Sequence, residues 1–192
     1  MNYQESLKFI EESHKFGIRL GLENSMKLLE LLGNPQDKLK IIHVAGTNGK
    51  GSVCSFIANS LHAQGYKVGL YTSPYLEKFT ERIRINGENI PEEDVARIVT
   101  LMREKIEQMV KEGFSYPTEF EIETAMAFYY YWEQGVDYDA TNVIKDSLAS
   151  VIVSLSLDHI GILGDTLGKI AYEKAGIIKP NGLTISYKQK EE

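Results

Sequence analysis

The chain has 192 residues, of which 43% are hydrophobic and 25% charged, a composition typical of one globular α/β domain. Its formal net charge of −6 argues against a general nucleic-acid-binding protein, which would carry a basic surface. An anionic substrate is still compatible with this charge, because a few local cations can hold a phosphate.

Cys54 is the only cysteine, so the sequence excludes an internal disulfide and a cysteine-based metal cluster. Its neighbours are apolar, and we expect a buried thiol that packs as a small hydrophobic side chain. The first five residues lack the basic start and apolar core of a signal peptide, and no run is long enough to span a bilayer. We therefore expect a cytoplasmic monomer without a membrane partner.

Apolar residues at helical spacing predict two helices at the start of the chain, over 3–12 and 23–32. The β-branched run 39–45 is typical of a buried parallel strand, and a helix to about Gln64 follows it. Residues 67–72 predict the next strand. This strand–helix–strand order predicts an α/β fold, with a largely parallel sheet flanked by helices.

The remaining elements are indicated by turn residues, helix caps and apolar runs. They are a hairpin around Asn86-Gly87, a helix from Pro91 to Gly113, a helix from the Thr118–Glu121 capping box to about Glu133, a strand over 149–155, a helix over 166–175 and a strand over 183–187. No linker is long enough to divide the chain, so we expect one domain over residues 1–192.

A glycine-rich segment, Gly46-Thr47-Asn48-Gly49-Lys50-Gly51-Ser52, joins the first predicted strand to its helix. Such a turn exposes backbone N–H groups at the positive end of the helix dipole. Lys50 adds a charge suited to the β- and γ-phosphates of a nucleotide, and the Ser52 hydroxyl can ligate magnesium. The segment therefore predicts a nucleotide-phosphate site.

The match to the general P-loop pattern is imperfect. Val44 stands where the leading glycine belongs, and Gly51 stands where a serine or threonine should follow the lysine. The alternative is a glycine-rich turn that only caps a helix, with Lys50 as a solvated surface lysine.

Segment 43–53 resembles the signature of the folylpolyglutamate synthase and dihydrofolate synthase family, within the Mur ligase superfamily, whose members share a GT-x-GK loop. Further blocks similar to family segments follow in the family's order: 71–74 with 79–83, 118–121, 139–142, 157–159 and 173–179. The resemblance covers essentially the whole chain. It implies the P-loop-type, mostly parallel sheet of the Mur ligase central domain.

The resemblance implies an ATP- and magnesium-dependent ligase of folate metabolism. The carboxylate of a folate or dihydropteroate would attack the γ-phosphate of ATP and become an acyl phosphate. The amine of L-glutamate would then displace phosphate and leave an amide. The protein would act by positioning these groups and by stabilising the charge on the transferred phosphoryl group.

The resemblance also implies which residues hold the nucleotide and the metal. The phosphates would be bound by the loop residues Thr47, Asn48, Gly49, Lys50, Gly51 and Ser52. Ser52 would contact one magnesium ion, and Ser73 and His159 would help to hold a second. Lys50 and His159 are therefore expected catalytic residues.

Two further assignments follow from the same resemblance. Lys174 matches a lysine that is carbamylated in the superfamily, which turns a cation into a metal-binding carboxylate, and it is the third expected catalytic residue. The pterin pocket would be lined by Thr118, Phe120, Asp139 and Ala140, with Phe120 as a stacking face and Asp139 as a hydrogen-bond acceptor.

Each assignment has a structural alternative. Ser73 could simply end a strand, and His159 could be a neutral histidine satisfied by backbone groups. Thr118 could serve only as a helix cap. Lys174 could be an exposed lysine, although its helix-spaced neighbours are apolar rather than acidic.

The sequence departs from the family between Tyr138 and Asp139. Family members carry there the rest of a strand, which ends in an acidic magnesium ligand, and then a glycine-rich stretch. Losing part of a middle strand would leave buried strand edges unpaired, which is costly. We therefore expect residues to be missing from this sequence, and an interruption of the chain between these two residues in the structure.

The family also continues into a second α/β domain, so we expect the chain to be incomplete at its C-terminal end and inactive in ligation by itself. Two other classes stay open. A muramyl-type ligase is disfavoured by Ser73-Pro74 and by the 139–142 block. The other is a non-catalytic nucleotide-binding module, which would truly lack the acidic ligand and the second domain. The sequence does not separate folate extension from dihydrofolate synthesis.

Overall fold

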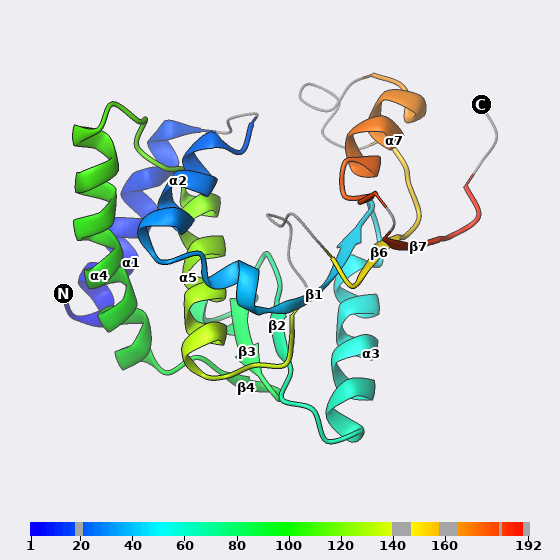
Figure 1. The fold of residues 1–192 in the computed structure, drawn as a ribbon, viewed down its shortest axis with the longest axis horizontal. Helices are drawn as coiled ribbons and strands as arrows, with labels where there is room; N and C mark the ends of the chain where they lie inside the picture. Colours follow the sequence, from blue (N-terminus) through cyan, green and yellow to red (C-terminus); the bar gives the residue numbers. More distant parts are fainter. Residues whose placement is uncertain (18–20, 140–146, 158–164, 181, 190–192) are drawn as a thin grey trace.

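A computed structural model describes residues 1–17, 21–139, 147–157, 165–180 and 182–189. Figure 1 shows a helical layer on the left, strands in the centre, and helices α3 and α7 on the right. The N-terminus lies beside the helical layer, and the last strand lies at the opposite end of the molecule.

The helical layer holds most of the hydrophobic core. Its members are α1 (Tyr3–Glu12), η1 (Ser13–Phe16), α2 (Glu23–Leu31), η2 (Pro35–Lys38), α4 (Glu92–Lys111) and α5 (Glu119–Glu133). The buried face of α4 repeats at helical spacing and includes Val95, Ile98, Met102 and Ile106. Because α4 packs against α1, α2 and α5, this apolar stripe unites the layer.

Four parallel strands form the sheet that carries the nucleotide loop. They are β1 (Lys40–Ala45), β5 (Tyr138–Asp139), β6 (Ala149–Ile152) and β7 (Leu183–Ser186), in the spatial order β5-β1-β6-β7. β1 pairs along its length with β6, from Ile42 opposite Ala149 to Ala45 opposite Ile152. Helix α7 (Leu167–Ala175) lies in the chain between β6 and β7.

A second, antiparallel sheet lies beside the first. It contains β2 (Gly69–Tyr71), β3 (Ile83–Ile85) and β4 (Glu88–Asn89), and η3 (Phe79–Arg82) precedes β3. Asn86 and Gly87 both have positive φ, as the tight hairpin turn requires. One parallel bridge, between Val68 and Tyr138, joins this sheet to β5.

The predicted fold class is confirmed, because a mostly parallel sheet is flanked by helices. Helix α3 (Lys50–Ala63) contacts β1 and β2, and Tyr131 of α5 packs against Gly69 of β2. β1 and β2 point the same way but do not pair, because β5 lies between them. Their direction therefore fits the predicted strand–helix–strand unit, whereas β2 itself belongs to the antiparallel sheet.

Most predicted boundaries agree with the structure to within a few residues, with small corrections. Pro91 is the N-cap of α4 rather than its first residue, since its ψ of 144° is extended. Thr166 likewise caps α7. The predicted strand over 149–155 ends at Ile152, where the chain turns toward the glycine-rich loop.

Tyr138 and Asp139 lie together in one short strand, and the expectation that residues are missing between them stays a prediction. Both residues form β5, opposite Lys40 and Ile41 of β1. Tyr138 is paired on both sides, with Lys40 of β1 and with Val68.

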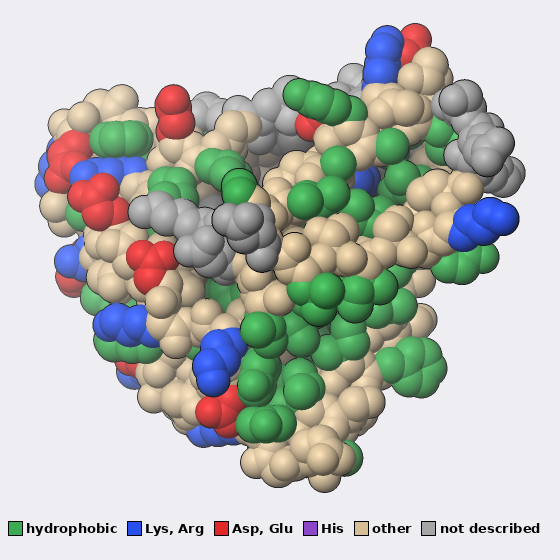
Figure 2. All heavy atoms as spheres, turned by 45° about the vertical axis from the view of Figure 1, so that its right-hand side comes forward, with side chains coloured by type: hydrophobic (Ala, Val, Ile, Leu, Met, Phe, Trp, Pro, Cys, Tyr) green, Lys and Arg blue, Asp and Glu red, His purple; other side chains and the backbone are tan. Residues whose placement is uncertain are grey.

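The surface is uneven in its apolar content. Figure 2 shows hydrophobic side chains gathered on the side of the molecule where α3 and β7 lie. Exposed residues there include Phe56 on α3 and Leu183 and Ile185 on β7. No helix in the described ranges is both long and apolar enough to cross a bilayer.

The capping box of α5 provides a test of the fold. Thr118 Oγ1 accepts a hydrogen bond from the Glu121 amide at 3.3 Å, and the Thr118 amide donates to Glu121 Oε2 at 2.8 Å. Thr118→Val should lower the free energy of unfolding by about 1 kcal/mol, measured by urea denaturation. Thr118→Ser keeps the hydroxyl and is the control. Equal stability of the Val and Ser variants would contradict the capping role.

Candidate nucleotide and substrate site

The glycine-rich loop lies between the end of β1 and the first turn of α3. Gly49 is the N-cap of α3 with φ 87°, and Gly46 has φ 144°, so both use backbone regions that favour glycine. Lys50 is the first residue of the helix and Ser52 lies exposed in its first turn. Free amides of that turn therefore meet at the positive end of the helix dipole, as predicted for an anion site.

Lys50 is held by its own loop. Its ammonium Nζ donates to the carbonyl oxygens of Gly46 and Thr47, both at 2.8 Å. Its charge consequently lies over the centre of the loop rather than in bulk water. An incoming phosphate would offer a stronger, charge-assisted partner at the same place.

The loop is fastened to the segment that follows β6. Thr47 donates its amide to Ser154 O at 2.9 Å and its Oγ1 to Ser156 O at 3.1 Å, and the Ser156 amide donates back to Thr47 Oγ1 at 3.1 Å. Asn48 adds a longer contact to Ser156 Oγ at 3.5 Å. These contacts fix the loop against two strand ends, a feature that the sequence analysis did not identify.

Gly46 permits this close approach. A Cβ built on Gly46 would lie 2.4 Å from Val153 Cγ2 and 3.2 Å from the backbone oxygen of Ser154. A larger residue there would require the Val153 side chain to move and the adjoining Val153–Ser154 backbone to shift slightly. The glycine is thus required by packing as well as by its positive φ.

Ser73 lies exposed in a loop that begins after β2, and the Ser73–Pro74 peptide bond is cis. The Thr72 amide donates to Arg82 O at 2.9 Å and closes the base of this loop. Glu81 accepts from three successive backbone amides, those of Leu76, Glu77 and Lys78, at 2.9–3.1 Å. These hydrogen bonds lower the pKa of the Glu81 carboxyl.

The predicted pterin-pocket residues lie in two places. Thr118 is buried as the cap of α5, so its structural role is confirmed, while Phe120 is half-exposed one position into the helix. The Phe120 ring lies 6.3 Å from the ring of Tyr71. These two rings provide an aromatic surface at the N-terminus of α5.

Asp139 lies in β5 and is 2% exposed. Burial, together with the charge of Asp139, raises the pKa of the Cys54 thiol to about 11, which confirms Cys54 as a buried, neutral side chain. Lys174 lies half-buried in the last turn of α7. Ala140 and His159 lie outside the described residues.

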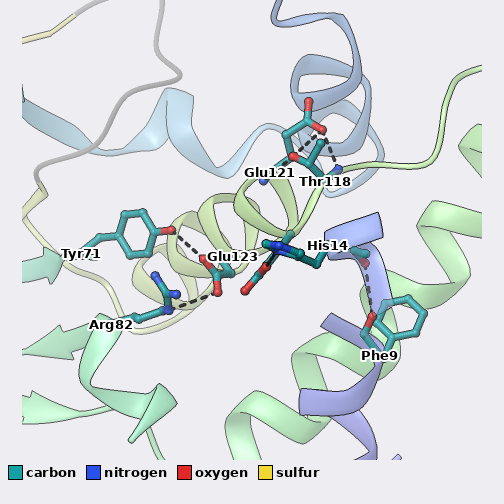
Figure 3. Close-up of polar contacts among 9 residues, drawn as sticks. Phe9, His14, Tyr71, Arg82, Thr118, Glu121 and Glu123 are labelled. Atoms are coloured by element: carbon teal, nitrogen blue, oxygen red, sulfur yellow. Dashed lines mark hydrogen bonds and ion pairs between the residues drawn. The ribbon is translucent and has the colours of Figure 1, made fainter. Parts of the chain in front are cut away.

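A buried polar group on α5 escaped the sequence analysis. Glu123 is 2% exposed, and its carboxylate faces Arg82 Nε at 3.1 Å and Tyr71 Oη at 3.5 Å (Figure 3). Burial raises the pKa of Glu123 to about 7 despite the nearby guanidinium. The signal in the sequence is an acidic residue within the apolar run Ile122–Phe128.

The packing of Gly46 gives a direct test of the loop. Gly46→Ala should lower the free energy of unfolding by about 1–3 kcal/mol, because its Cβ would overlap Val153 and because φ 144° strains any other residue. Gly51→Ala is the matched control. A Cβ added at Gly51 would meet no atom within 4 Å, and Gly51 has ordinary helical geometry. The free energy of unfolding of Gly51→Ala should therefore equal or exceed that of the unmodified protein. Urea denaturation measures the free energy of unfolding of both variants. A Gly46→Ala protein as stable as the unmodified one would contradict the packing role of Gly46.

No protein-family model matches this chain. Among curated proteins, it is 43% identical over 189 residues to the dihydrofolate synthase/folylpolyglutamate synthase of Bacillus subtilis, covering 92% of this chain and 44% of that protein. It is 39% identical over 191 residues to the folylpolyglutamate synthase of Lacticaseibacillus casei, covering 93% and 44%. The chain thus spans less than half the length of these relatives.

The same alignments contain positions that this chain lacks. The match to the B. subtilis protein is 189 residues long, whereas 92% of 192 residues is about 177, a difference of about 12. The match to the L. casei protein is 191 residues long, whereas 93% of 192 residues is about 179, again a difference of about 12 residues. The relatives therefore carry about a dozen additional residues within the matched region.

The fold agrees with the sequence similarity. A solved complex described as FPGS–AMPPCP–folate superposes with a TM-score of 0.90 at 37% identity, covering 99% of this chain and 49% of that one. A folylpolyglutamate synthase from Thermotoga maritima superposes with a TM-score of 0.86 at 38% identity, covering 98% and 44%. Over the part of these proteins that it spans, the chain belongs to the folylpolyglutamate synthase/dihydrofolate synthase family.

Proposed function

We propose that the chain is the nucleotide- and folate-binding part of an ATP-dependent ligase that joins L-glutamate to a folate or to dihydropteroate. The observation that carries this proposal is the loop between β1 and α3, which presents Lys50 and free helix amides in a chain of this family. A relative of the same fold was solved with AMPPCP and folate, and we transfer both ligand classes to this chain.

The reaction would proceed in two steps. A carboxylate oxygen of the folate attacks the γ-phosphorus of ATP, the bond to the bridging oxygen of ADP breaks, and an acyl phosphate forms. The glutamate amine then attacks the acyl carbon, the bond to the phosphate oxygen breaks, and inorganic phosphate leaves while the amine loses a proton. Activation is needed because an unmodified carboxylate has no adequate leaving group.

For the first step we assign the phosphates to the loop 47–52. Backbone amides at the start of α3 would bind phosphate oxygens, and the Lys50 ammonium would move from the carbonyls of Gly46 and Thr47 to the β- and γ-phosphates. Because Thr47 is fastened to Ser154 and Ser156, the amides are held in place before the nucleotide arrives.

Magnesium would neutralise phosphate charge when bound. Within the described residues no group of three or more His, Cys, Asp or Glu could hold a metal by itself. The exposed hydroxyls of Ser52 and Ser73 suit an ion that keeps water ligands and shares substrate phosphates, so they fit the proposed role. His159 stays proposed as a further ligand, and carbamylation of Lys174 stays a prediction.

For the folate side we propose the N-terminal end of α5. The half-exposed Phe120 ring offers a stacking face beside Tyr71, and Thr118 lies two residues before it as the helix cap. Asp139, which lies in β5, and Ala140 stay proposed as further residues of the folate site. Because the relatives are about twice as long, we expect residues beyond this chain's span to complete the glutamate and nucleotide sites.

The relatives' additional residues bear on whether this chain is a ligase or a binding module. We place them between Tyr138 and Asp139, because β5 has only two residues there while β1 has six. Within the described ranges, β1 pairs with β5 only at Lys40 and Ile41. An apolar pocket lined by Ile42, Cys54 and Leu70 lies where a longer β5 would run.

Resequencing of the gene and an intact mass of the purified protein test this placement. We expect about a dozen residues more than are printed here, consistent with the alignment difference. An intact chain in which Asp139 follows Tyr138 directly would contradict the placement. The proposal would then change to a non-catalytic nucleotide-binding module.

Lys50 tests the catalytic proposal. In the full-length protein, Lys50→Ala should lower the rate of glutamate incorporation at least about a hundredfold, because a charge at the transferring phosphoryl group is lost. Thermal unfolding should be nearly unchanged, since Lys50 bonds only to loop carbonyls. Lys8→Ala, on the exposed face of α1, is the control and should keep full activity.

The assay uses dihydropteroate and tetrahydrofolate as separate acceptors and so also assigns the substrate. An active Lys50→Ala enzyme would contradict the role of the loop. Absence of incorporation with both acceptors in the unmodified full-length protein would overturn the proposed function.

A further inference from the structure

The 73–81 loop and the start of α5 meet at one buried ion pair. Glu123 lies one turn after Phe120 on α5, and residues three apart share a helix face. Within the described residues its carboxylate forms an ion pair with Arg82, with Nε to Oε1 at 3.1 Å. Arg82 ends η3, directly after the 73–81 loop.

Arg82 connects this carboxylate to the loop itself. Its guanidinium lies over the ring of Tyr75 at 4.9 Å and near the ring of Phe79 at 6.0 Å. The backbone oxygen of Arg82 accepts from the Thr72 amide at 2.9 Å, one residue before Ser73. The Arg82 side chain thus contacts Glu123 on α5 (Figure 3) and also two aromatic residues of the loop.

Tyr71 provides the second connection. Its hydroxyl lies 3.5 Å from Glu123 Oε2, while its ring lies 6.3 Å from the ring of Phe120. The residue that precedes the loop therefore contacts both the buried carboxylate and the proposed stacking ring.

Stability alone is a poor explanation for this arrangement. Both charged side chains are largely withdrawn from water, at 2% and 11% exposure. Desolvation of such a pair often outweighs its attraction, and apolar residues of similar volume would commonly be as stable. The ion pair instead fixes the position of α5 relative to the loop that ends at Arg82, two segments that are distant in sequence.

We propose that Glu123 is a positioning residue of the folate side, which through Arg82 and Tyr71 fixes the 73–81 loop and the Phe120 ring relative to one another. The role in substrate binding rests on the proposed ligase function. The mechanical role, fixing the loop, does not.

The test compares Glu123→Gln with a matched change on the same helix. Glu133→Gln removes a different ion pair of α5, between Glu133 Oε2 and Arg97 Nη2 at 2.7 Å, far along the helix from Glu123. Arg82→Gln breaks the proposed clamp from the loop side and serves as second variant if Glu123→Gln folds poorly. All are made in the full-length protein, with thermal unfolding as the check on folding.

Hydrogen exchange gives the first measurement. Amides of Leu76, Glu77 and Lys78 are protected by Glu81, and they should exchange at least about tenfold faster in Glu123→Gln and Arg82→Gln but not in Glu133→Gln. Unchanged exchange in both clamp variants would overturn the proposal.

Steady-state kinetics gives the second measurement. The KM for the folate acceptor should rise about tenfold in the clamp variants, while the KM for L-glutamate should change less than about twofold. Parallel rises in both constants would indicate a general structural loss and would overturn the positioning role. If the unmodified protein incorporates no glutamate, the ligase function fails by itself, and hydrogen exchange then decides whether the clamp exists.

Discussion

The contact of Gly46 with the 153–156 segment is the constraint on which the nucleotide side of the molecule depends. It allows the loop after β1 to lie directly against the end of the neighbouring strand, where Thr47 exchanges hydrogen bonds with Ser154 and Ser156. A loop held in this way presents its amides and Lys50 in one geometry before any ligand binds. Preorganised donors of this kind contribute to phosphoryl transfer because they need no rearrangement during the reaction.

The proposed folate side depends on different contacts, a helix capping box and a buried ion pair. The N-terminus of α5 is fixed by the Thr118–Glu121 capping box, and Glu121 also accepts from Ser25 at 2.9 Å, which ties the cap to α2. Two residues after Glu121, Glu123 ties the helix to β2 and η3. The half-exposed Phe120 therefore lies between two fixed points. The two sides of the site share β2, which follows α3 in the chain and leads into the Ser73 loop.

The sequence predicted those features that depend on local patterns. Helix α5 followed from its capping box, the β3–β4 hairpin from Asn86-Gly87, and the loop between β1 and α3 from its glycines. Long-range polar contacts could not be predicted in this way. Neither the pairing of Thr47 with Ser156, 109 residues away, nor that of Arg82 with Glu123 has any periodic signal. The position of β5 between β1 and β2 also depends on tertiary pairing.

The central claim is that the loop between β1 and α3 binds the phosphates of ATP. A crystal structure of the full-length protein with AMPPCP and magnesium tests it most directly. We expect the β- and γ-phosphates at the N-terminus of α3, with Lys50 Nζ moved from the Gly46 and Thr47 carbonyls onto phosphate oxygens. Phosphates bound elsewhere, with Lys50 still bonded to its own loop, would contradict it.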